Sequence, residues 1–341
     1  MYVEAVPDHG HDAPDQQLDP RRDRRPDPLP HGADRTGRAP GATPVAAVVS
    51  AFRPGPSLVR VCESVAGQVD LLVVVDDGPG HAAQTEETLA ACRALGAQVV
   101  RHETNRGIGA ALNSGLAAAR AAGDLTGGFV LTLDQDSAVP PGYVDALVAA
   151  ARSATDHGLR VAMVGPEVVE SIGSMVAARP EHEPWRGREP IQSGLLVPVA
   201  ALEQLGDFDA DLFIDGVDSD FYLRAVTRGW DVVVAPGTRL AHRLGTEHAV
   251  AGTRARLVHA APFRYYYIAR NRVVLLRRYG RTAPGWCARA VLKDVRHLAV
   301  TTLAVPGRRA RLAATLEGWR DGLRGTTGPR PIRPDRPEKA L

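Results

Sequence analysis

Two acidic pairs stand directly after apolar runs of the chain, Asp76 with Asp77 and Asp134 with Asp136. Open α/β sheets bind ligands beyond the carboxyl ends of their strands, so both pairs are expected at one edge of a sheet. Like charges gathered there repel each other unless a cation intervenes. Asp134 and Asp136 therefore predict a site for Mg²⁺ or Mn²⁺, which favour oxygen ligands. The alternative is that the acids cap turns or helices, and it is weaker for two pairs than for one.

A further group of carboxylates lies in one short stretch, at Asp215, Asp218 and Asp220. On a helix that begins near Gly216, Asp220 and Arg224 are four residues apart and are expected to form an ion pair. Asp218 points elsewhere, which makes it the better candidate for a general base that takes a proton from a hydroxyl. The alternative is an acid that the helix dipole favours at a helix N-terminus.

These carboxylates need a sheet to position them, and the chain supplies short apolar runs separated by stretches of helical spacing. Near-continuous apolar runs suit strands that are covered on both faces, as in a parallel sheet. The alternation predicts an α/β domain with a mostly parallel sheet flanked by helices. The predicted strands are residues 45–49, 71–75, 98–101, 129–133, 161–164, 194–197 and 232–234.

Composition sets the expected domain boundaries. Residues 1–43 contain almost no large apolar side chains, which predicts a disordered tail. The α/β domain is expected over residues 44–255, with a long polar loop at 170–190 that is functional or mobile. A helical, amphipathic, basic extension follows over residues 256–325, and a disordered Pro/Arg-rich tail over 326–341.

Bulk properties exclude several classes of protein. The net charge is only +2, which argues against nucleic acid as a partner. No apolar run approaches the ~18 residues that a membrane span needs, and the first residues lack the apolar stretch of a signal peptide. Three widely spaced cysteines, Cys62, Cys92 and Cys287, fit a reducing cytoplasm.

The late part of the chain is rich in arginine and tyrosine, and it has two interpretations. One is an interfacial surface that meets anionic lipid. The other is a solvated helical face whose arginines pair with internal acids. The residues concerned are Arg264, Arg270, Arg272, Arg277 and Arg278 with Tyr265, Tyr266 and Tyr267.

Three further residues are ambiguous when taken alone. His242 by itself would be read as a structural or surface residue. Trp185, in the polar loop, is a candidate for stacking on an acceptor sugar, or else a partly buried anchor. Gly107 belongs to no dinucleotide fingerprint, because no strand ends before it with the required spacing. We interpret Gly107 as permitting a tight entry into the following helix.

Taken together, four segments make the chain resemble the family 2 glycosyltransferases over residues 45–278. They are Val-Val-Asp-Asp-Gly at 74–78, Asn-Arg-Gly-Ile-Gly at 105–109, Leu-Asp-Gln-Asp-Ser at 133–137 and Phe-Ile-Asp-Gly-Val-Asp-Ser-Asp-Phe-Tyr-Leu-Arg at 213–224. With the run Tyr-Tyr-Tyr-Ile-Ala-Arg-Asn-Arg at 265–272, the chain is most similar to the rhamnosyltransferase-like subgroup. Galactofuranosyltransferases share the same motifs.

The resemblance implies a GT-A type, Rossmann-like fold and a donor site at the ends of the first strands. It implies that Asp77 recognises the base of the nucleotide, with Ser50 beside it and Gly107 near the donor. Asp134 and Asp136 match the pair of acids that holds the metal and the donor diphosphate.

The remaining implied roles lie later in the chain. Asp218 matches the catalytic base, although Val217 stands where many relatives carry Glu, so the preceding residue does not confirm the register. His242 matches a histidine that is a third metal ligand in some relatives. The segment with Ser193 and Gly194 resembles an acceptor-side segment.

The resemblance implies an inverting, metal-dependent transfer of a sugar from a nucleotide sugar to a hydroxyl of a glycan or lipid-linked glycan. L-rhamnose from dTDP-L-rhamnose is the first choice, and galactofuranose or another hexose is an alternative. A sugar-phosphate nucleotidyltransferase would want a Gly-rich basic loop after the first strand, and residues 51–55 make a poor one. A non-catalytic sugar-binding scaffold would not need a positioned base. The expected location is cytoplasmic, with peripheral contact at the inner face of the membrane, in cell wall polysaccharide synthesis.

Overall fold

The computed structural model describes residues 43–78, 82–181, 184–242, 246–249, 256–259 and 261–330. Its main sheet is built from β1 (Val45–Ala51), β2 (Leu71–Asp76), β3 (Gln98–Arg101), β4 (Phe129–Asp134), β5 (Val161–Val169), β6 (Gly173–Ser174), β7 (Val176–Ala178), β8 (Arg186–Gly187), β9 (Leu195–Pro198) and β10 (Asp231–Leu240). A separate hairpin pairs β11 (Thr246–Ala249) with β12 (Arg256–His259).

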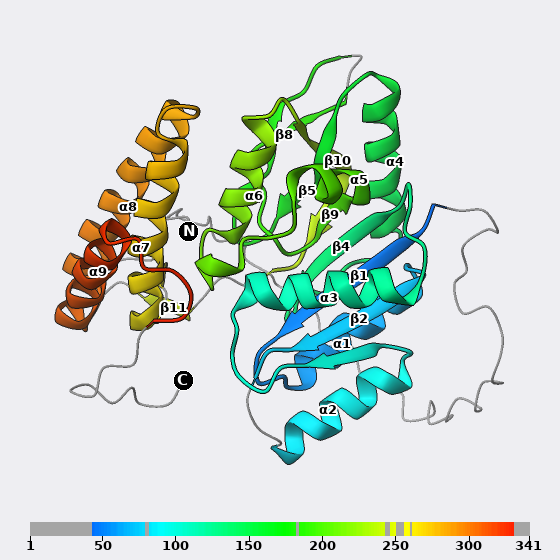
Figure 1. The fold of residues 1–341 in the computed structure, drawn as a ribbon, viewed down its shortest axis with the longest axis horizontal. Helices are drawn as coiled ribbons and strands as arrows, with labels where there is room; N and C mark the ends of the chain where they lie inside the picture. Colours follow the sequence, from blue (N-terminus) through cyan, green and yellow to red (C-terminus); the bar gives the residue numbers. More distant parts are fainter. Residues whose placement is uncertain are drawn as a thin grey trace, which may run out of the picture.

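The main sheet has the order β3-β2-β1-β4-β9-β5-β10-β8-β7, with β6 beside β5 (Figure 1). The first four strands in this order are parallel, and so are β5 and β10. Strand β9 runs antiparallel between β4 and β5 and joins these two parallel groups. The α/β class is confirmed, and its sheet is mixed.

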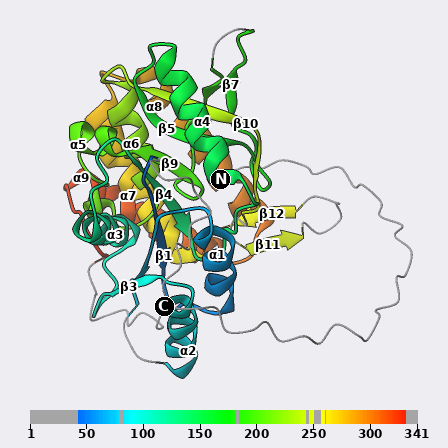
Figure 2. The same cartoon turned by 90° about the vertical axis from the view of Figure 1, so that its right-hand side faces the viewer.

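Helices cover both faces of the sheet. They are α1 (Pro56–Ala66), α2 (Ala83–Ala94), α3 (Ile108–Ala122), α4 (Tyr143–Asp156), α5 (Val199–Leu205) and α6 (Val217–Val226), with a 3₁₀ turn at Ala210–Leu212. Alternate residues of β1 show the two layers, because Ala47 belongs to the core cluster that contains α1, α2 and α4, whereas Val48 belongs to the cluster that contains α3, α5 and α6. Figure 2 shows α1 and α3 on opposite sides of β1. Burial on both faces explains why this strand is apolar except at Ser50, near its end.

Three helices follow the sheet domain: α7 (Pro262–Tyr279), α8 (Pro284–Ala304) and α9 (Arg308–Leu323). Leu275 of α7 and Trp286 of α8 belong to the same core cluster as α3 and α6, so this extension packs on the domain. Gly318 of α9 lies against the backbone of α7, where an added Cβ would come within 2.3 Å of the Tyr266 carbonyl oxygen. A side chain at this position would therefore push α7 and α9 apart.

All seven predicted strands are present, and two other predictions need correction. The predicted loop at 170–190 contains three short strands: β8 and β7 end one side of the sheet, and β6 pairs with β5. The predicted C-terminal tail is ordered at its start, because the N–H of Arg330 donates to Tyr267 Oη (2.8 Å). Residues 331–341 and 1–42, as well as the expected boundary near 255, lie outside the described residues.

Candidate functional site

The predicted donor residues meet at the carboxyl ends of β1, β2 and β4. Ser50 pairs in register with Asp134 on one side and with Val75 on the other, so Asp77 and Asp134 flank it. In Figure 1 these strands run toward the side of the molecule on which α7 lies. A cleft of about 640 Å³ opens there. Its lining includes Ser50, Asp77, Gly107, Asp134, Asp136, Ser193, Asp215, Asp218, His242 and Arg264.

Asp77 is buried and tied to the loop that follows β3. Its two carboxylate oxygens accept hydrogen bonds from the N–H groups of Arg106 (2.8 Å) and Gly107 (2.7 Å). His102 Nδ1 lies 2.7 Å from Asp77 Oδ1. Because a carboxylate has about four acceptor positions, these three donors leave one for a ligand. His102 was not singled out from the sequence, since an isolated histidine in a loop carries no pattern.

Gly107 shapes this part of the cleft through its backbone. It is the residue before α3 and has φ +85°, a left-handed conformation that favours glycine. An added Cβ would come within 2.4 Å of the Phe213 carbonyl oxygen. The predicted tight entry into the helix is present, and it brings the loop after β3 against the segment that precedes α6.

The three predicted metal ligands lie together. One ligand atom from each of Asp134, Asp136 and His242 falls within 4.8 Å of the others. Burial and the like charges of Asp136 and Asp218 raise the pKa of Asp134 to about 7. Burial lowers the pKa of His242, which favours the neutral imidazole that binds metals. Two carboxylates and one imidazole suit Mn²⁺ or Mg²⁺ with open positions for phosphate.

Two neighbouring residues orient this group. His242 Nδ1 lies 2.7 Å from Ser137 Oγ, an arrangement like the outer hydrogen bond of metal-ligating histidines. The side chain of Gln135 exchanges two hydrogen bonds with the backbone of Phe52, at 3.1 Å and 3.3 Å. The residue between the two acids thus ties the end of β4 to the end of β1.

Asp218 lies in the first turn of α6, in the same cleft. Its Oδ1 accepts a hydrogen bond from the N–H of Ser219 (2.8 Å), and no arginine or lysine of the described chain forms an ion pair with it. Burial, followed by the negative charges of Glu189 and Asp215, raises its pKa to about 6. A carboxylate with this pKa is ionised at neutral pH and still basic enough to accept a proton.

The segment before α6 has an unusual backbone that α7 stabilises. Phe213 (φ +65°) and Asp215 (φ +63°) are left-handed although neither is glycine. Buried Asn271 of α7 donates from Nδ2 to the carbonyl oxygens of Ile214 (2.8 Å) and Asp215 (2.6 Å). Such strained conformations persist where surrounding contacts hold them, and they cluster at functional sites.

Arg264, at the start of α7, reaches into the cleft from the helical extension. Its guanidinium holds Asp215 through two hydrogen bonds, of 2.5 Å and 3.1 Å. The pKa of Arg264 is raised chiefly by Asp215, and the charges of Asp134 and Asp218 act in the same direction. From the sequence, Arg264 was assigned only to a basic helical region, because nothing local indicates that it faces the donor site.

Most of that Arg/Tyr-rich region packs against the protein, which favours the alternative in which its arginines pair internally over a lipid-facing surface. Tyr265, Tyr266 and Tyr267 are buried, and so is Arg270, which donates to the carbonyl oxygen of Leu212 (2.8 Å). Arg272 pairs with Asp294, and Arg277 donates to the carbonyl oxygen of Leu323. These arginines fasten α7 to the domain and to its neighbouring helices.

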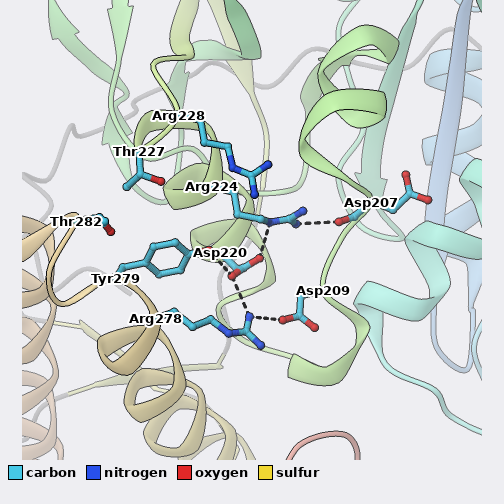
Figure 3. A pocket seen from close by; sticks show the side chains of 9 residues that line it. All are labelled: Asp207, Asp209, Asp220, Arg224, Thr227, Arg228, Arg278, Tyr279 and Thr282. Carbon is cyan, nitrogen blue, oxygen red and sulfur yellow. Dashed lines mark hydrogen bonds and ion pairs between the residues drawn. The ribbon is translucent and has the colours of Figure 1, made fainter.

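A second pocket, of about 560 Å³, lies between α6 and the end of α7 (Figure 3). Asp220 is buried there and accepts hydrogen bonds from Arg224 Nε (2.8 Å), Tyr279 Oη (2.8 Å) and Arg278 Nη1 (3.1 Å). Arg278 also pairs with Asp209. The predicted ion pair between Asp220 and Arg224 is confirmed, within a larger network.

Of the three predicted acceptor residues, one lines the cleft and two do not. Ser193 lines the cleft, and its Oγ accepts a hydrogen bond from the N–H of Asp134 (2.9 Å). Gly194 is buried with φ +74°, and Tyr143 Oη and Leu240 occupy the space of a side chain. Trp185 is not among the lining residues, because its ring packs on the core and under the guanidinium of Arg179. Trp185 therefore matches the alternative of a partly buried anchor.

Comparison with known proteins agrees with this site. Residues 46–170 match the family model described as glycosyl transferase family 2. That match contains Asp77, Asp134 and Asp136, and it ends before Asp218 and His242.

Individual proteins match this chain only at low identity or over part of their length. The dTDP-rhamnosyl transferase RfbF of Shigella flexneri is 30% identical over 152 residues, which are 42% of this chain and 48% of that protein. The chain thus spans about half the length of this curated relative. A crystal structure of GalNAc-T7 with UDP, GalNAc and Mn²⁺ has a TM-score of 0.54 at 14% identity, and the match covers 83% of this chain and 56% of that one. At this identity the likeness supports the fold, which is of GT-A type.

Proposed function

We propose, from the family 2 glycosyltransferase domain that this chain carries, that it transfers a sugar from a nucleotide sugar to an acceptor hydroxyl with inversion. The donor we favour is dTDP-L-rhamnose, by similarity to the Shigella flexneri protein. One observation carries the proposal: a metal-ligand group and a carboxylate with a raised pKa lie in one cleft.

Asp134, Asp136 and His242 would hold the divalent cation. The fit rests on the donor set, two carboxylates and an imidazole that burial keeps neutral, and on the repulsion between the acids that a cation would relieve. A bound Mg²⁺ or Mn²⁺ supplies positive charge that stabilises the diphosphate leaving group. The ion bound with GalNAc-T7 is Mn²⁺.

Asp218 would accept the proton of the acceptor hydroxyl. A base that acts on the attacking hydroxyl while the sugar-phosphate bond breaks gives a single displacement, which inverts the anomeric centre. Within the described residues Asp218 has no cationic partner, whereas Asp220, two residues on, has Arg224 and Arg278. The proton acceptor is therefore Asp218 rather than its neighbour.

The nucleotide would lie along Ser50, Asp77 and Gly107. Asp77 retains an acceptor position suited to an N–H of the base, and its other contacts fix the loop after β3. Arg264 would bind the diphosphate, because a guanidinium matches phosphate oxygens and this one already points into the cleft. Its present partner, Asp215, keeps the guanidinium in place.

The proposal extends to the class of acceptor and to the location of the enzyme. We favour a hydroxyl of a glycan or lipid-linked glycan, contacted near Ser193, and a cytoplasmic enzyme in peripheral contact with an anionic membrane. Among the described residues, no helix is long and apolar enough to cross a bilayer.

The test is an assay of the purified chain with dTDP-L-rhamnose, UDP-galactofuranose and other nucleotide sugars, with Mn²⁺ and a lipid-linked glycan extract. We expect release of the nucleoside diphosphate with dTDP-L-rhamnose and a glycoside of inverted configuration by NMR. Release of pyrophosphate from a nucleoside triphosphate and a sugar phosphate would instead identify a nucleotidyltransferase. Binding of donors without any release would identify a scaffold.

A further inference from the structure

Helix α8 carries an apolar stripe on its exposed side. Leu292 is 70% exposed and Leu303 is 88% exposed, and Val295 lies between them, also exposed. With the exposed Ala288 and Ala299, the spacing is four, three, four and four residues, which places all five on one side of the helix. The opposite side of α8 contributes Trp286 and Ala290 to the core of the domain. Helix α8 therefore has two apolar sides: one packs on the domain, and the other, the stripe, faces solvent.

Helix α9 repeats the pattern. Leu312, Leu316, Trp319 and Leu323 are exposed at spacings of four, three and four residues, with Leu316 at 60% and Leu323 at 67%. Scattered apolar residues on a surface are ordinary, whereas rows of large side chains on consecutive helices mark an interaction site. Figure 1 shows α8 and α9 at the outer edge of the molecule, on the side away from α1 and α2.

The charges around the two stripes have one sign. Over residues 284–325 the acids are Asp294, Glu317 and Asp321, and each is at least partly buried and paired, with Arg272, Arg330 and Arg320 respectively. The exposed charged residues of this segment are all basic: Arg289, Lys293, Arg296, Arg308, Arg309 and Arg324. Each of the two helices therefore carries exposed large apolar side chains beside exposed cations.

We propose that this surface, the exposed stripes of α8 and α9 with their flanking arginines, docks on an anionic lipid bilayer. Amphipathic helices with large apolar residues on one side and Lys/Arg beside them lie in the interfacial plane of such a membrane. Anionic headgroups match the cations, at roughly a fivefold gain in binding for each charge. A second copy of the chain fits less well, because its surface would present cations to cations.

The docking surface differs from the donor cleft and does not depend on it. The lipid-facing residues are none of those that line the cleft. Arg264 of α7 lines the cleft and Asn271 holds the backbone beside it, while α8 and α9 continue the same extension. One further inference rests on the proposed function. If the chain is a glycosyltransferase held at a bilayer in this way, its acceptor is one that is itself anchored in lipid.

The experiment is flotation of the full chain with vesicles of phosphatidylglycerol mixed with phosphatidylcholine, and with vesicles of phosphatidylcholine alone. We expect binding to the anionic vesicles at low salt and its loss at high salt. The stripe variant combines Leu292→Ser, Leu303→Ser and Leu316→Ser, and the charge variant combines Arg296→Gln, Arg308→Gln and Arg309→Gln. All six side chains are exposed, so both variants are expected to fold.

The charge variant should bind anionic vesicles about 100-fold more weakly, from three lost charges, and the stripe variant at least tenfold more weakly. A matched control, Arg60→Gln with Arg93→Gln on α1 and α2, removes two exposed cations elsewhere and should bind as the parent chain does. Equal flotation of all three variants would overturn the proposal.

Two further measurements separate the outcomes. Donor turnover in solution should be the same in the parent and in both variants. If none of the three proteins turns over donor, the proposed function is wrong and the docking proposal is unaffected. If light scattering shows a dimer that the stripe variant converts to a monomer, and vesicles are not bound, the surface joins two copies of the chain and the lipid proposal is wrong.

Discussion

The two acid-lined pockets differ in what neutralises their carboxylates. In the pocket between α6 and α7, Asp220 is surrounded by Arg224, Arg278 and Tyr279 (Figure 3). In the cleft at the strand ends, Asp134 and Asp218 have no such partners among the described residues, and burial raises their pKa values to about 7 and about 6.

This difference separates acids that stabilise the fold from acids that are available for chemistry. A buried carboxylate that two arginines neutralise, such as Asp220, has its charge balanced within the protein and needs no metal ion or proton for that purpose. Buried carboxylates without cations are costly to the fold, and they persist where a metal ion or a substrate proton is part of the function. Asp218 and Asp220 show the contrast within a single turn of α6.

The largest effect is expected from Asp218→Asn, which keeps the shape of the side chain and removes its basicity. Turnover at saturating donor should fall by ~10²- to 10⁴-fold, while donor affinity and the melting temperature stay near those of the parent. Transfer rate and donor affinity, measured on the same preparations, check this. If Asp218→Asn turns over normally and Asp215→Asn or Asp220→Asn does not, the base is one of its neighbours.

Asp220→Asn should act on stability instead. It leaves Arg224 and Arg278 without their buried counter-charge, so the free energy of unfolding should fall by ~3 kcal/mol. Urea denaturation of both proteins measures this. The control is Asp207→Asn, whose ion pair with Arg120 is exposed and should be worth about 1 kcal/mol or less. Equal losses in the two variants would contradict the proposed contrast.

Arg264→Gln should weaken donor binding by ~10- to 100-fold, the effect of one lost charge-assisted hydrogen bond of ~1.5–3 kcal/mol. Arg264→Lys should recover part of the affinity, since the charge remains. The matched control is Arg278→Gln, which lies in the other pocket and should leave donor affinity unchanged. Calorimetric titration with dTDP-L-rhamnose distinguishes these results.

The smallest effect is the dependence of the rate on pH. A general base acts in its ionised form, and the pKa of Asp218 is raised to about 6. The ratio kcat/KM should therefore be constant well above pH 6 and fall tenfold per pH unit well below it. With saturating Mn²⁺, which would keep Asp134 (pKa about 7) ionised, a profile that rises further from pH 7 to 8 would point to a base with a higher pKa.

The sequence predicts the cleft well where the fold itself positions the residues. Asp77 and Asp134 follow parallel strands, so their meeting at one edge follows from topology. Arg264 and Asn271 could not be placed from the sequence, because their contacts with the segment at 213–216 depend on how α7 packs.

In the helical extension, too, the sequence did not show which sides of the helices are covered. A cluster of arginines and tyrosines suggested a surface, yet Arg270 and Tyr266 are buried, since α9 covers that side of α7. The exposed leucines of α8 and α9 gave no comparable signal, because periodicity alone does not tell which side of an amphipathic helix is covered.

The most direct test of the account is the protection of the chain against heating by a panel of nucleotide sugars, with Mn²⁺ and with EDTA. A ligand present at about 100 times its Kd adds ~2.7 kcal/mol to the folded state, so a specific donor should raise Tm by several degrees. We expect this rise with dTDP-L-rhamnose and Mn²⁺, and its loss with EDTA or in Asp136→Ala. A rise that neither EDTA nor Asp136→Ala changes would contradict the metal-dependent donor site.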